Sequence, residues 1–383
     1  MLPAGPLGGL TGAGLGRLCW GVCGLAVEPF AATASVPIAA MGAGMGFPGR
    51  AGGACRHVWV GVEVWVSLDS GHGWLEVGSR LNLLFIVCPA FPRTVFMSII
   101  KPFRHLDCGD GARLELVGPH RLVRPVPTAF WSPGLDRREW AQAEARYIRS
   151  STGGGDWDHL DRLPEAWTVA YAGLNWWIKP TGFGHLGLFP EQAENWAWLR
   201  QRVAALGGAE ARVLNLFAYT GGSTLCCAQA GGEVTHVDAS RGIVSWAREN
   251  SALNGLEGAP IRWIVDDVLK FTRREIRRGV KYRGVILDPP TFGRGSKGEV
   301  WKIETDLPAL LGDCLSLLAD GPAFILLSCH SPGFTPLILQ EVLRGTMRRA
   351  GGLYEAGEMV VSADADGGVS LPTGTWVRWW RAD

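Results

Sequence analysis

Acidic side chains follow three apolar segments in the C-terminal half of the sequence. Asp238 ends the segment EVTHVD, Asp267 ends IRWIVDD, and Asp288 ends RGVILD just before two prolines. Short apolar segments of this kind are typical of buried parallel strands, whose carboxyl ends meet at one edge of a sheet. We therefore expect the three carboxylates to gather at a ligand site, unless each only caps the helix that follows it.

A glycine-bearing turn precedes these acids. The segment NLFAYTGG leads from an apolar strand through Tyr219 and Gly221 into a helix, whose first backbone N–H groups can hold a polar or anionic ligand. Asp238 follows at a distance suited to an acid that binds ribose hydroxyls, and either Asp266 or Asp267 could accept a hydrogen bond from an adenine amino group. The turn lacks the G-x-G-x-x-G spacing of dinucleotide-binding proteins, which disfavours a nicotinamide-dependent oxidoreductase.

The elements that must position these residues change in character along the chain. Residues 101–188 contain short strand-like segments, such as RLELVG, WTVAYAGLNWWIKP and LGLFP, and one helical stretch at residues 138–149. From residue 194 onward, helical segments alternate with five apolar strands. The pattern predicts an α/β fold with a doubly wound, mostly parallel sheet, together with a small, mainly β N-terminal domain.

The first 96 residues differ from the rest of the chain. They hold nine charged residues and no lysine, whereas residues 97–383 carry 64 charged residues. One interpretation is a transit peptide; the other is that Met97 is the native start and that the preceding extension is poorly ordered or not part of the native protein. We expect the extension over 1–96 to contribute little to function, a β-rich substrate-side domain over 97–192, and the ligand-binding domain over 193–383.

The overall composition restricts the class of protein. Lys and Arg (37) nearly balance Asp and Glu (36), so contact with nucleic acid must come from a local patch. The nine cysteines lack metal-like spacing, and we expect free thiols in a reducing compartment and no metal site. The N-terminus makes a poor signal peptide, and the stretch LNLLFIVCPAF is too short to span a membrane. These features indicate a cytoplasmic protein without a membrane partner.

Three longer segments carry a specific resemblance. VLNLFAYTGGSTLCCAQAGGEVTHVDAS, WIVDDVLKF and VILDPPTFGRG are similar to motifs of class I S-adenosylmethionine-dependent methyltransferases, and more narrowly to the ribosomal RNA large-subunit cytosine-C5 methyltransferase family. The resemblance covers roughly residues 180–350. It implies a seven-stranded, Rossmann-like methyltransferase fold over residues 193–383, S-adenosylmethionine as the cofactor, and RNA, in particular ribosomal RNA, as the substrate.

The same resemblance implies roles for individual residues. Asp238 is expected to bind the ribose of the cofactor and Asp267 its adenine. Gln192 lies in GLFPEQAENW, which resembles an L-D-Q-R segment of the family, although Ala193 stands where the family has arginine. The implied cofactor-binding residues are Gln192, Phe217, Tyr219, Thr220, Gly221, Asp238, Asp267, Asp288 and Pro289, and the implied substrate-binding residues are Pro290 and Phe292.

A second reactive residue, Cys329, ends the fifth apolar segment at the same predicted sheet edge as Asp288. Cytosine C5 is a poor nucleophile, and addition of a thiolate to C6 makes C5 able to attack a methyl group. Cys329 in S-C-H matches the position of the family's nucleophile in S-C-S, and Asp288 is expected to orient the base. The alternative is that Cys329 is a small buried residue at a strand end, as we expect for Cys314 on its helix.

The residues after DPP bear on the substrate as well. In methyltransferases that modify exocyclic amines an aromatic residue follows the prolines directly, whereas here Thr291 does and Phe292 comes one position later. This departure favours C5 chemistry. Three other functions stay open: methylation of another base, methylation of a protein or small molecule without covalent catalysis, and a non-catalytic, RNA-binding relative.

Two groups of residues could contact RNA outside the reaction centre. Trp176, Trp177 or His185 could stack on a base, although core packing explains the tryptophans equally well. The helical segment TRREIRRGVKYR places Arg273, Arg274, Arg277, Arg278 and Lys281 at helical spacing on one side, where they could track phosphates, or it is a solvated helix face.

Overall fold

The computed structural model describes residues 36–38, 61–68, 75–82, 100–150, 154–294, 298 and 300–382. The chain divides into two units, residues 1–96 and 97–383. In the first unit, β1 (Val36–Ile38), β2 (Gly61–Leu68) and β3 (Leu75–Asn82) form an antiparallel sheet. The expectation that residues 1–96 are poorly ordered or not native concerns mainly residues outside the described ranges, and it stays a prediction.

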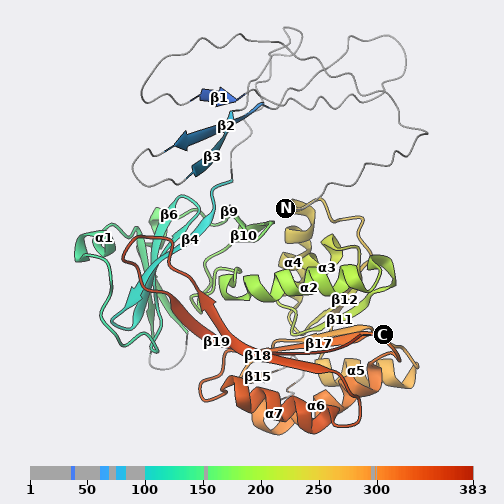
Figure 1. The fold of residues 1–383 in the computed structure, drawn as a ribbon. Coiled ribbons are helices and arrows are strands. Elements are labelled where there is room, and N and C mark those ends of the chain that lie inside the picture. Colours follow the sequence, from blue (N-terminus) through green and yellow to red (C-terminus); the bar gives the residue numbers. More distant parts are fainter. Residues whose placement is uncertain are drawn as a thin grey trace, which may run out of the picture. The chain divides into compact units, whose positions relative to one another are not determined.

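A seven-stranded sheet forms the centre of the second unit, as predicted (Figure 1). Five neighbouring strands are parallel, and the last two form an antiparallel hairpin at one end of the sheet. The strand order, 13-12-11-14-17-19-18, reverses its direction of progress beside β11, and ligands bind at such a point in open α/β sheets. The strands are β11 (Arg212–Leu216), β12 (Glu233–Asp238), β13 (Ile261–Val265), β14 (Gly284–Leu287), β17 (Ala323–Cys329), β18 (Leu353–Val361) and β19 (Leu371–Arg381).

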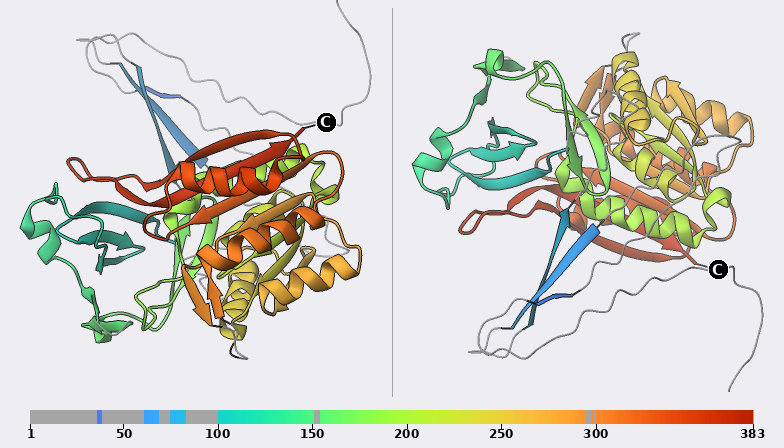
Figure 2. Two further views of the ribbon diagram at one scale, coloured as in Figure 1. Left: turned by 90° about the horizontal axis from the view of Figure 1, so that it is seen from below. Right: turned by 90° about the horizontal axis from the view of Figure 1, so that it is seen from above.

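Helices cover both faces of this sheet, because alternate residues of its inner strands are apolar on each side (Figures 1 and 2). Val213 and Leu326 belong to one core cluster, and their neighbours Leu214 and Leu327 belong to the other. The first cluster includes buried residues of α2 and α3, and the second includes those of α5, α6 and α7. The helices are α2 (Ala193–Ala205), α3 (Gly222–Gln229), α4 (Arg241–Leu253), α5 (Val268–Arg277), α6 (Ile303–Leu317) and α7 (Pro336–Met347).

A five-stranded sheet precedes the central sheet and matches the predicted small β region. Asp107 joins it to the loop before β19, because its carboxylate accepts a hydrogen bond from Val369 N (3.0 Å); the same carboxylate accepts one from Leu135 N (2.9 Å) within the β region. A separate two-stranded hairpin turns through Ala172 and Gly173, both with positive φ, as a type I′ turn requires. The strands are β4 (Phe103–Gly109), β5 (Ala112–Val117), β6 (His120–Pro125), β7 (Ala145–Arg149) and β8 (Gly155–Asp158), with the hairpin of β9 (Trp167–Tyr171) and β10 (Leu174–Ile178).

The helix predicted over residues 138–149 is wrong in its second half. Helix α1 (Arg137–Ala141) begins at the cap residue Asp136 and ends after five residues, and β7 follows. Pairing with β6 and β8 outweighs the helix propensity of the segment, because it buries Ala145 and Tyr147 on one face. The predicted strand LGLFP is instead an irregular link, bent at Gly187 (φ 89°), to the 3₁₀ turn η2 (Pro190–Gln192).

The described part of the chain contains free cysteines and no helix suited to crossing a membrane. All five cysteines described there are free and buried: Cys108, Cys226, Cys227, Cys314 and Cys329. Among the helices of the described ranges, none combines the length and the apolar character that crossing a bilayer requires.

Candidate active site

A cavity of about 510 Å³ opens at the carboxyl ends of the central parallel strands. This volume suits a ligand of the size of a nucleoside derivative. Most of the residues singled out from the sequence line the cavity, whereas Gly221, Phe292 and Cys329 are not in its wall. The lining residues among those predicted are Gln192, Phe217, Tyr219, Thr220, Asp238, Asp267, Asp288, Pro289 and Pro290.

The turn between β11 and α3 has an unusual backbone. Phe217 (φ 54°) and Tyr219 (φ 48°) are both in the left-handed region, which large side chains rarely adopt. Tertiary hydrogen bonds offset this strain: Tyr219 N donates to Asp238 Oδ2 (3.0 Å), and Thr220 Oγ1 donates to the Gly187 carbonyl (2.6 Å). Residues held in such conformations cluster at functional sites, and here they direct the start of α3 toward the cavity.

The start of α3 provides backbone donors. Its N-cap, Gly221 (φ 94°), offers no side chain to the first N–H groups, and Gly222 and Ser223 line the cavity. A Cβ at Gly222 would lie only 2.5 Å from the Trp196 ring, so only glycine lets the helix start this close to α2. The free N–H groups of this turn suit a polar or anionic part of a ligand.

Asp238 is held in place by the backbone and does not cap α4. Its Oδ1 accepts from Ser240 N (2.9 Å) and its Oδ2 from Tyr219 N (3.0 Å), while the side chain of Ser240 caps the helix. Burial raises the pKa of Asp238 above its ordinary value, although the two backbone donors offset part of this effect. Each carboxylate oxygen retains acceptor capacity, so the side chain can still bind a ribose hydroxyl.

The two acids after β13 have separate roles. Asp267 caps α5 by accepting from Lys270 N (3.0 Å), and it also lines the cavity. Asp266 forms an ion pair with Arg274 (2.8 Å). Asp267, which was predicted to bind adenine, therefore caps a helix. Adenine binding by Asp267 stays a prediction.

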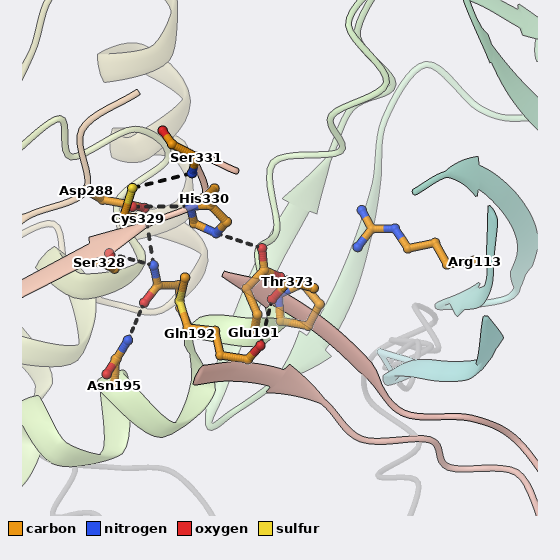
Figure 3. Close-up of polar contacts among 12 residues, drawn as sticks. Arg113, Glu191, Gln192, Asn195, Asp288, Ser328, Cys329, His330, Ser331 and Thr373 are labelled. Atoms are coloured by element: carbon orange, nitrogen blue, oxygen red, sulfur yellow. Dashed lines mark hydrogen bonds and ion pairs between the residues drawn. The ribbon is translucent and has the colours of Figure 1, made fainter. Parts of the chain in front are cut away.

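Asp288, in the cavity wall directly after β14, is the centre of a polar network (Figure 3). Gln192 Nε2 donates to Asp288 Oδ2 (3.2 Å) and to Ser328 Oγ (3.0 Å), and its Oε1 accepts from Asn195 Nδ2 (2.8 Å). The amide of Gln192 therefore joins the start of α2 to the ends of β14 and β17. This gives a structural reason for the glutamine in GLFPEQAENW.

The network continues through His330 to Glu191, a residue that the sequence did not single out. His330 Nδ1 lies 3.3 Å from Asp288 Oδ1, and His330 Nε2 lies 3.1 Å from Glu191 Oε1. Burial alone would lower the pKa of His330, but the two carboxylates raise it well above its ordinary value. Burial likewise opposes ionisation of Asp288, but attraction by His330 and the hydrogen bond from Gln192 outweigh it and lower the pKa of this carboxyl.

The thiol of Cys329 does not reach the cavity. Ser328 and His330 line it, and because successive residues of a strand point to opposite faces, Cys329 lies in the core cluster on the other face with Leu339 and Val377. The side chain is only 1% exposed, its sulfur accepts from Ser331 N (3.4 Å), and burial raises the pKa of the thiol. This position gives no support to the predicted nucleophile and matches the alternative of a small buried residue.

The loop after the prolines also differs from the prediction. Phe292 is half-exposed and lies outside the cavity wall, whereas Thr291 and Gly293 line it. Trp301 takes the place expected for an aromatic side chain: it donates to the Pro290 carbonyl (2.7 Å) and lines the cavity. Only the pairing of β15 (Phe292–Arg294) with β16 (Val300–Lys302) brings Trp301 here, so no local sequence signal identifies it.

The two groups proposed to contact RNA give different results. Trp176 and His185 line the cavity, and Trp176 also stacks on Trp196 at 5.0 Å. Desolvation beside the cavity and the charges of Arg124 and Arg113 lower the pKa of His185, although the residue is exposed. The basic helix has acidic partners: Arg274 pairs with Asp266, and the other pairs are Arg278–Glu275 and Arg273–Asp313. These pairs favour the solvated helix face over a phosphate-binding patch.

The fold and the site together define a class of protein. A doubly wound sheet, a glycine turn at its first strand, an acid after the second and DPP after the fourth are the features of a Rossmann-like transferase that binds a nucleoside-containing cofactor.

Comparison with known proteins identifies the family. The family model described as S-adenosylmethionine-dependent methyltransferase matches residues 131–356, more than half of the chain. The crystal structure of the SAM-dependent methyltransferase from Agrobacterium tumefaciens is 40% identical, with a TM-score of 0.68 over 74% of this chain and 93% of that chain. The chain belongs to the family of S-adenosylmethionine-dependent methyltransferases.

Curated relatives match a shorter part of the chain. The ribosomal RNA large subunit methyltransferases K/L of Hahella chejuensis and Shewanella frigidimarina are 34% and 36% identical over 165 residues. These regions are 43% and 42% of this chain but 22% of each relative, so the chain spans about a fifth of the relatives it matches.

The cavity fits the cofactor of this family. The free N–H groups at the start of α3 and the carboxylate of Asp238 present donors and acceptors to the cavity, which suits a ligand with both an amino-acid part and a ribose. Tyr219, Asp238 and Asp267 would hold the nucleoside, and Gly222 and Ser223 would face its polar tail. When bound, S-adenosylmethionine supplies a methyl group on a positively charged sulfur, which is open to attack by a nucleophile.

Proposed function

We propose that the chain transfers a methyl group to a nitrogen atom of a nucleobase in ribosomal RNA, without forming a covalent bond to the base. The observation that carries this proposal is the placement of Asp288 and Cys329: the carboxylate is in the cavity wall, and the thiol is not. The names of the relatives from Hahella chejuensis and Shewanella frigidimarina support large-subunit ribosomal RNA as the substrate.

A base nitrogen suits the groups that the cavity presents. A nitrogen attacks with its own lone pair and needs no prior addition of a thiolate to the ring, whereas cytosine C5 does. Asp288 can accept a hydrogen bond from the N–H of the base and so orient the lone pair, because Gln192 donates to its Oδ2 while Oδ1, 3.3 Å from His330 Nδ1, is buried and accepts no hydrogen bond from the described residues. His185, which is exposed in the same wall, offers a ring face for the base, whereas Trp176 is 1% exposed and stacks on Trp196 in the core.

Methylation of cytosine C5 would need the thiol of Cys329, at the end of β17, to face the cavity. Cys329 would have to leave the core cluster, where Ser331 N contacts its sulfur, and to enter the cavity between Ser328 and His330. It would also have to ionise, although burial raises the pKa of the thiol. Both requirements disfavour the covalent route inferred from the sequence.

The test is transfer of labelled methyl groups to ribosomal RNA from cells that lack this protein. Wild-type protein is expected to label the large-subunit RNA, and Asp288→Asn is expected to lose the activity while it still binds the demethylated cofactor. Asp266→Asn is the matched control, because Asp266 precedes the neighbouring helix and pairs with Arg274 outside the reaction centre. Absence of labelling by a wild-type protein that binds the cofactor would instead indicate a non-catalytic relative.

A further inference from the structure

We propose that Glu191 is a positioning residue that holds His330 against Asp288, so that Asp288 remains an ionised proton acceptor during methyl transfer. This inference rests on the proposed function, since it concerns the proton of the methylated nitrogen. Glu191 itself does not line the cavity, whereas His330 and Asp288 do. It therefore acts through His330.

The geometry is that of an imidazole between two carboxylates. His330 Nδ1 faces Asp288 Oδ1 at 3.3 Å, and Nε2 faces Glu191 Oε1 at 3.1 Å, so both ring nitrogens point at acceptors (Figure 3). Nε2 makes a hydrogen bond to Glu191, and Nδ1 is at ion-pair distance from Asp288; a neutral imidazole has only one N–H, whereas the imidazolium can pair with both carboxylates. The Phe189 ring lies tilted beside the same histidine, with the two ring centroids 6.0 Å apart.

The charged groups that adjoin His330 and Glu191 favour a protonated histidine between two ionised carboxylates. Asp288 at the end of β14 and Glu191 in η2 attract the proton of His330, and the neutral Cys329 thiol adjoins it in β17. Arg113 of β5 adds a positive charge that helps keep Glu191 ionised. Burial opposes ionisation of Glu191, but the hydrogen bond from His330 outweighs it and lowers the pKa of the carboxyl.

The hydrogen bonding of Glu191 to the described part of the chain is incomplete, because only its Oε1 is paired with His330. Within the described residues, Glu191 Oε2 and Asp288 Oδ1 are both buried without a hydrogen-bond partner, and Glu191 is only 6% exposed. Burial of a carboxylate with a partner on one oxygen only is costly, and a purely structural contact would be as well served by a neutral amide. The cost is consistent with a residue kept for its charge.

Transfer of the methyl group to a base nitrogen also requires that this nitrogen lose a proton. The nitrogen of the base forms its bond to the methyl carbon with its lone pair, and the carbon–sulfur bond breaks with its electrons remaining on sulfur. The proton on nitrogen passes to Asp288, which releases it to water after the methylated base leaves the cavity. The imidazolium keeps Asp288 ionised before transfer, and it cannot take up the proton itself because both ring nitrogens already carry one.

The test combines a titration with a pH profile of the full-length protein. The His330 ring is followed by NMR without RNA, in wild type, in Glu191→Gln and in the control Glu194→Gln, which changes an exposed glutamate three residues away that pairs with Arg378. We expect a wild-type His330 pKa well above its ordinary value, a decrease of about one unit or more in Glu191→Gln, and no change in the control. An ordinary wild-type pKa would overturn the proposal even if a variant failed to fold.

The pH profile separates this role from simple support of the fold. The ion pair that positions Asp288 is lost when His330 loses its proton, so in Glu191→Gln the alkaline limb of the methyl-transfer rate should move to lower pH, while the acid limb, set by Asp288, stays in place. Equal losses at every pH, or weaker binding of the demethylated cofactor by calorimetry, would show a structural role and contradict the proposal. If wild type methylates no RNA, the proposed function fails, and the His330 titration still decides whether Glu191 positions the histidine.

Discussion

Ser328 and Cys329 are neighbours in β17 and face opposite sides of the central sheet. Ser328 Oγ accepts from Gln192 in the wall of the cavity (3.0 Å), whereas Cys329 packs with Leu339 in the core. The alternation of side chains along a strand thus separates the residue that supports Asp288 from the thiol. The chemistry proposed for this site depends on that separation.

Removal of the Cys329 thiol should leave methyl transfer nearly intact. Because the side chain is buried outside the cavity, Cys329→Ala is expected to retain activity within about twofold and to lower the free energy of unfolding by about 1 kcal/mol. Rates and urea unfolding measure both effects. Loss of activity by more than about a hundredfold in a folded variant would restore the nucleophile hypothesis.

A covalent trap tests the same residue from the side of the substrate. RNA that contains 5-fluorocytosine captures enzymes that add a thiolate to C6, because the adduct cannot lose fluorine as it would a proton. We expect no covalent complex on denaturing gels with wild type and cofactor, since burial raises the pKa of the Cys329 thiol and keeps it from the cavity. A complex that disappears in Cys329→Ala would contradict this expectation.

Loss of the Asp238 carboxylate should weaken cofactor binding. Asp238→Ala removes an acceptor from the cavity and also leaves Tyr219 N, at the strained turn, without its partner. Hydrogen bonds to charged groups contribute about 1.5–3 kcal/mol, so the affinity for the demethylated cofactor should decrease by roughly 10- to 100-fold. Calorimetry measures the affinity, and Glu233→Ala, an exposed position at the other end of β12, is the control. Unchanged affinity would exclude Asp238 from the site.

The Asp288–His330 pair should make stability depend on pH in two directions. The folded protein raises the pKa of His330, so this contribution is complete below about pH 6.5 and is lost as the pH rises through the folded value. It lowers the pKa of Asp288, so that contribution is present above about pH 3.8 and is lost as the pH falls through the folded value. The difference in unfolding free energy between wild type and His330→Gln should therefore be largest between these limits. A difference that is constant from pH 4 to pH 9 would exclude the pair.

Removal of Gln192 tests the support of the reaction centre. Gln192→Ala leaves Asn195 and Ser328 without their partner in a buried setting, and it frees Asp288 Oδ2. We expect a loss of about 1–3 kcal/mol in stability and a decrease of at least tenfold in kcat, with a smaller change in cofactor affinity. Gln229→Ala, an exposed amide at the end of α3, should change neither. A change in affinity alone would place Gln192 at the cofactor and not at Asp288.

The fold was predictable from the sequence because its inner strands are buried on both faces. Segments such as RVLNL and AFILLSC read as continuous apolar runs, and their alternation with helices predicts a parallel sheet. The helix predicted over residues 138–149 failed because strand pairing, which is not local, outweighs the propensity of Ala and Glu in that segment.

The site was predictable only where the strand ends determine it. Asp238 and Asp288 lie in the cavity wall because the ends of parallel strands meet at one edge. Cys329 and Phe292 depend on the direction of a single side chain, and a shift of one residue exchanges the two faces of a strand. Glu191 is 139 positions from His330 in the sequence, so only the folded chain reveals their contact.

Identification of the methylated nucleoside decides whether the methyl group is transferred to a base nitrogen or to cytosine C5. Large-subunit ribosomal RNA from cells without this protein is incubated with wild type and isotopically labelled S-adenosylmethionine, digested to nucleosides and analysed by mass spectrometry against standards. We expect label on a ring or exocyclic nitrogen, present with Cys329→Ala and absent with Asp288→Asn. Label on 5-methylcytidine that is lost with Cys329→Ala would contradict this expectation.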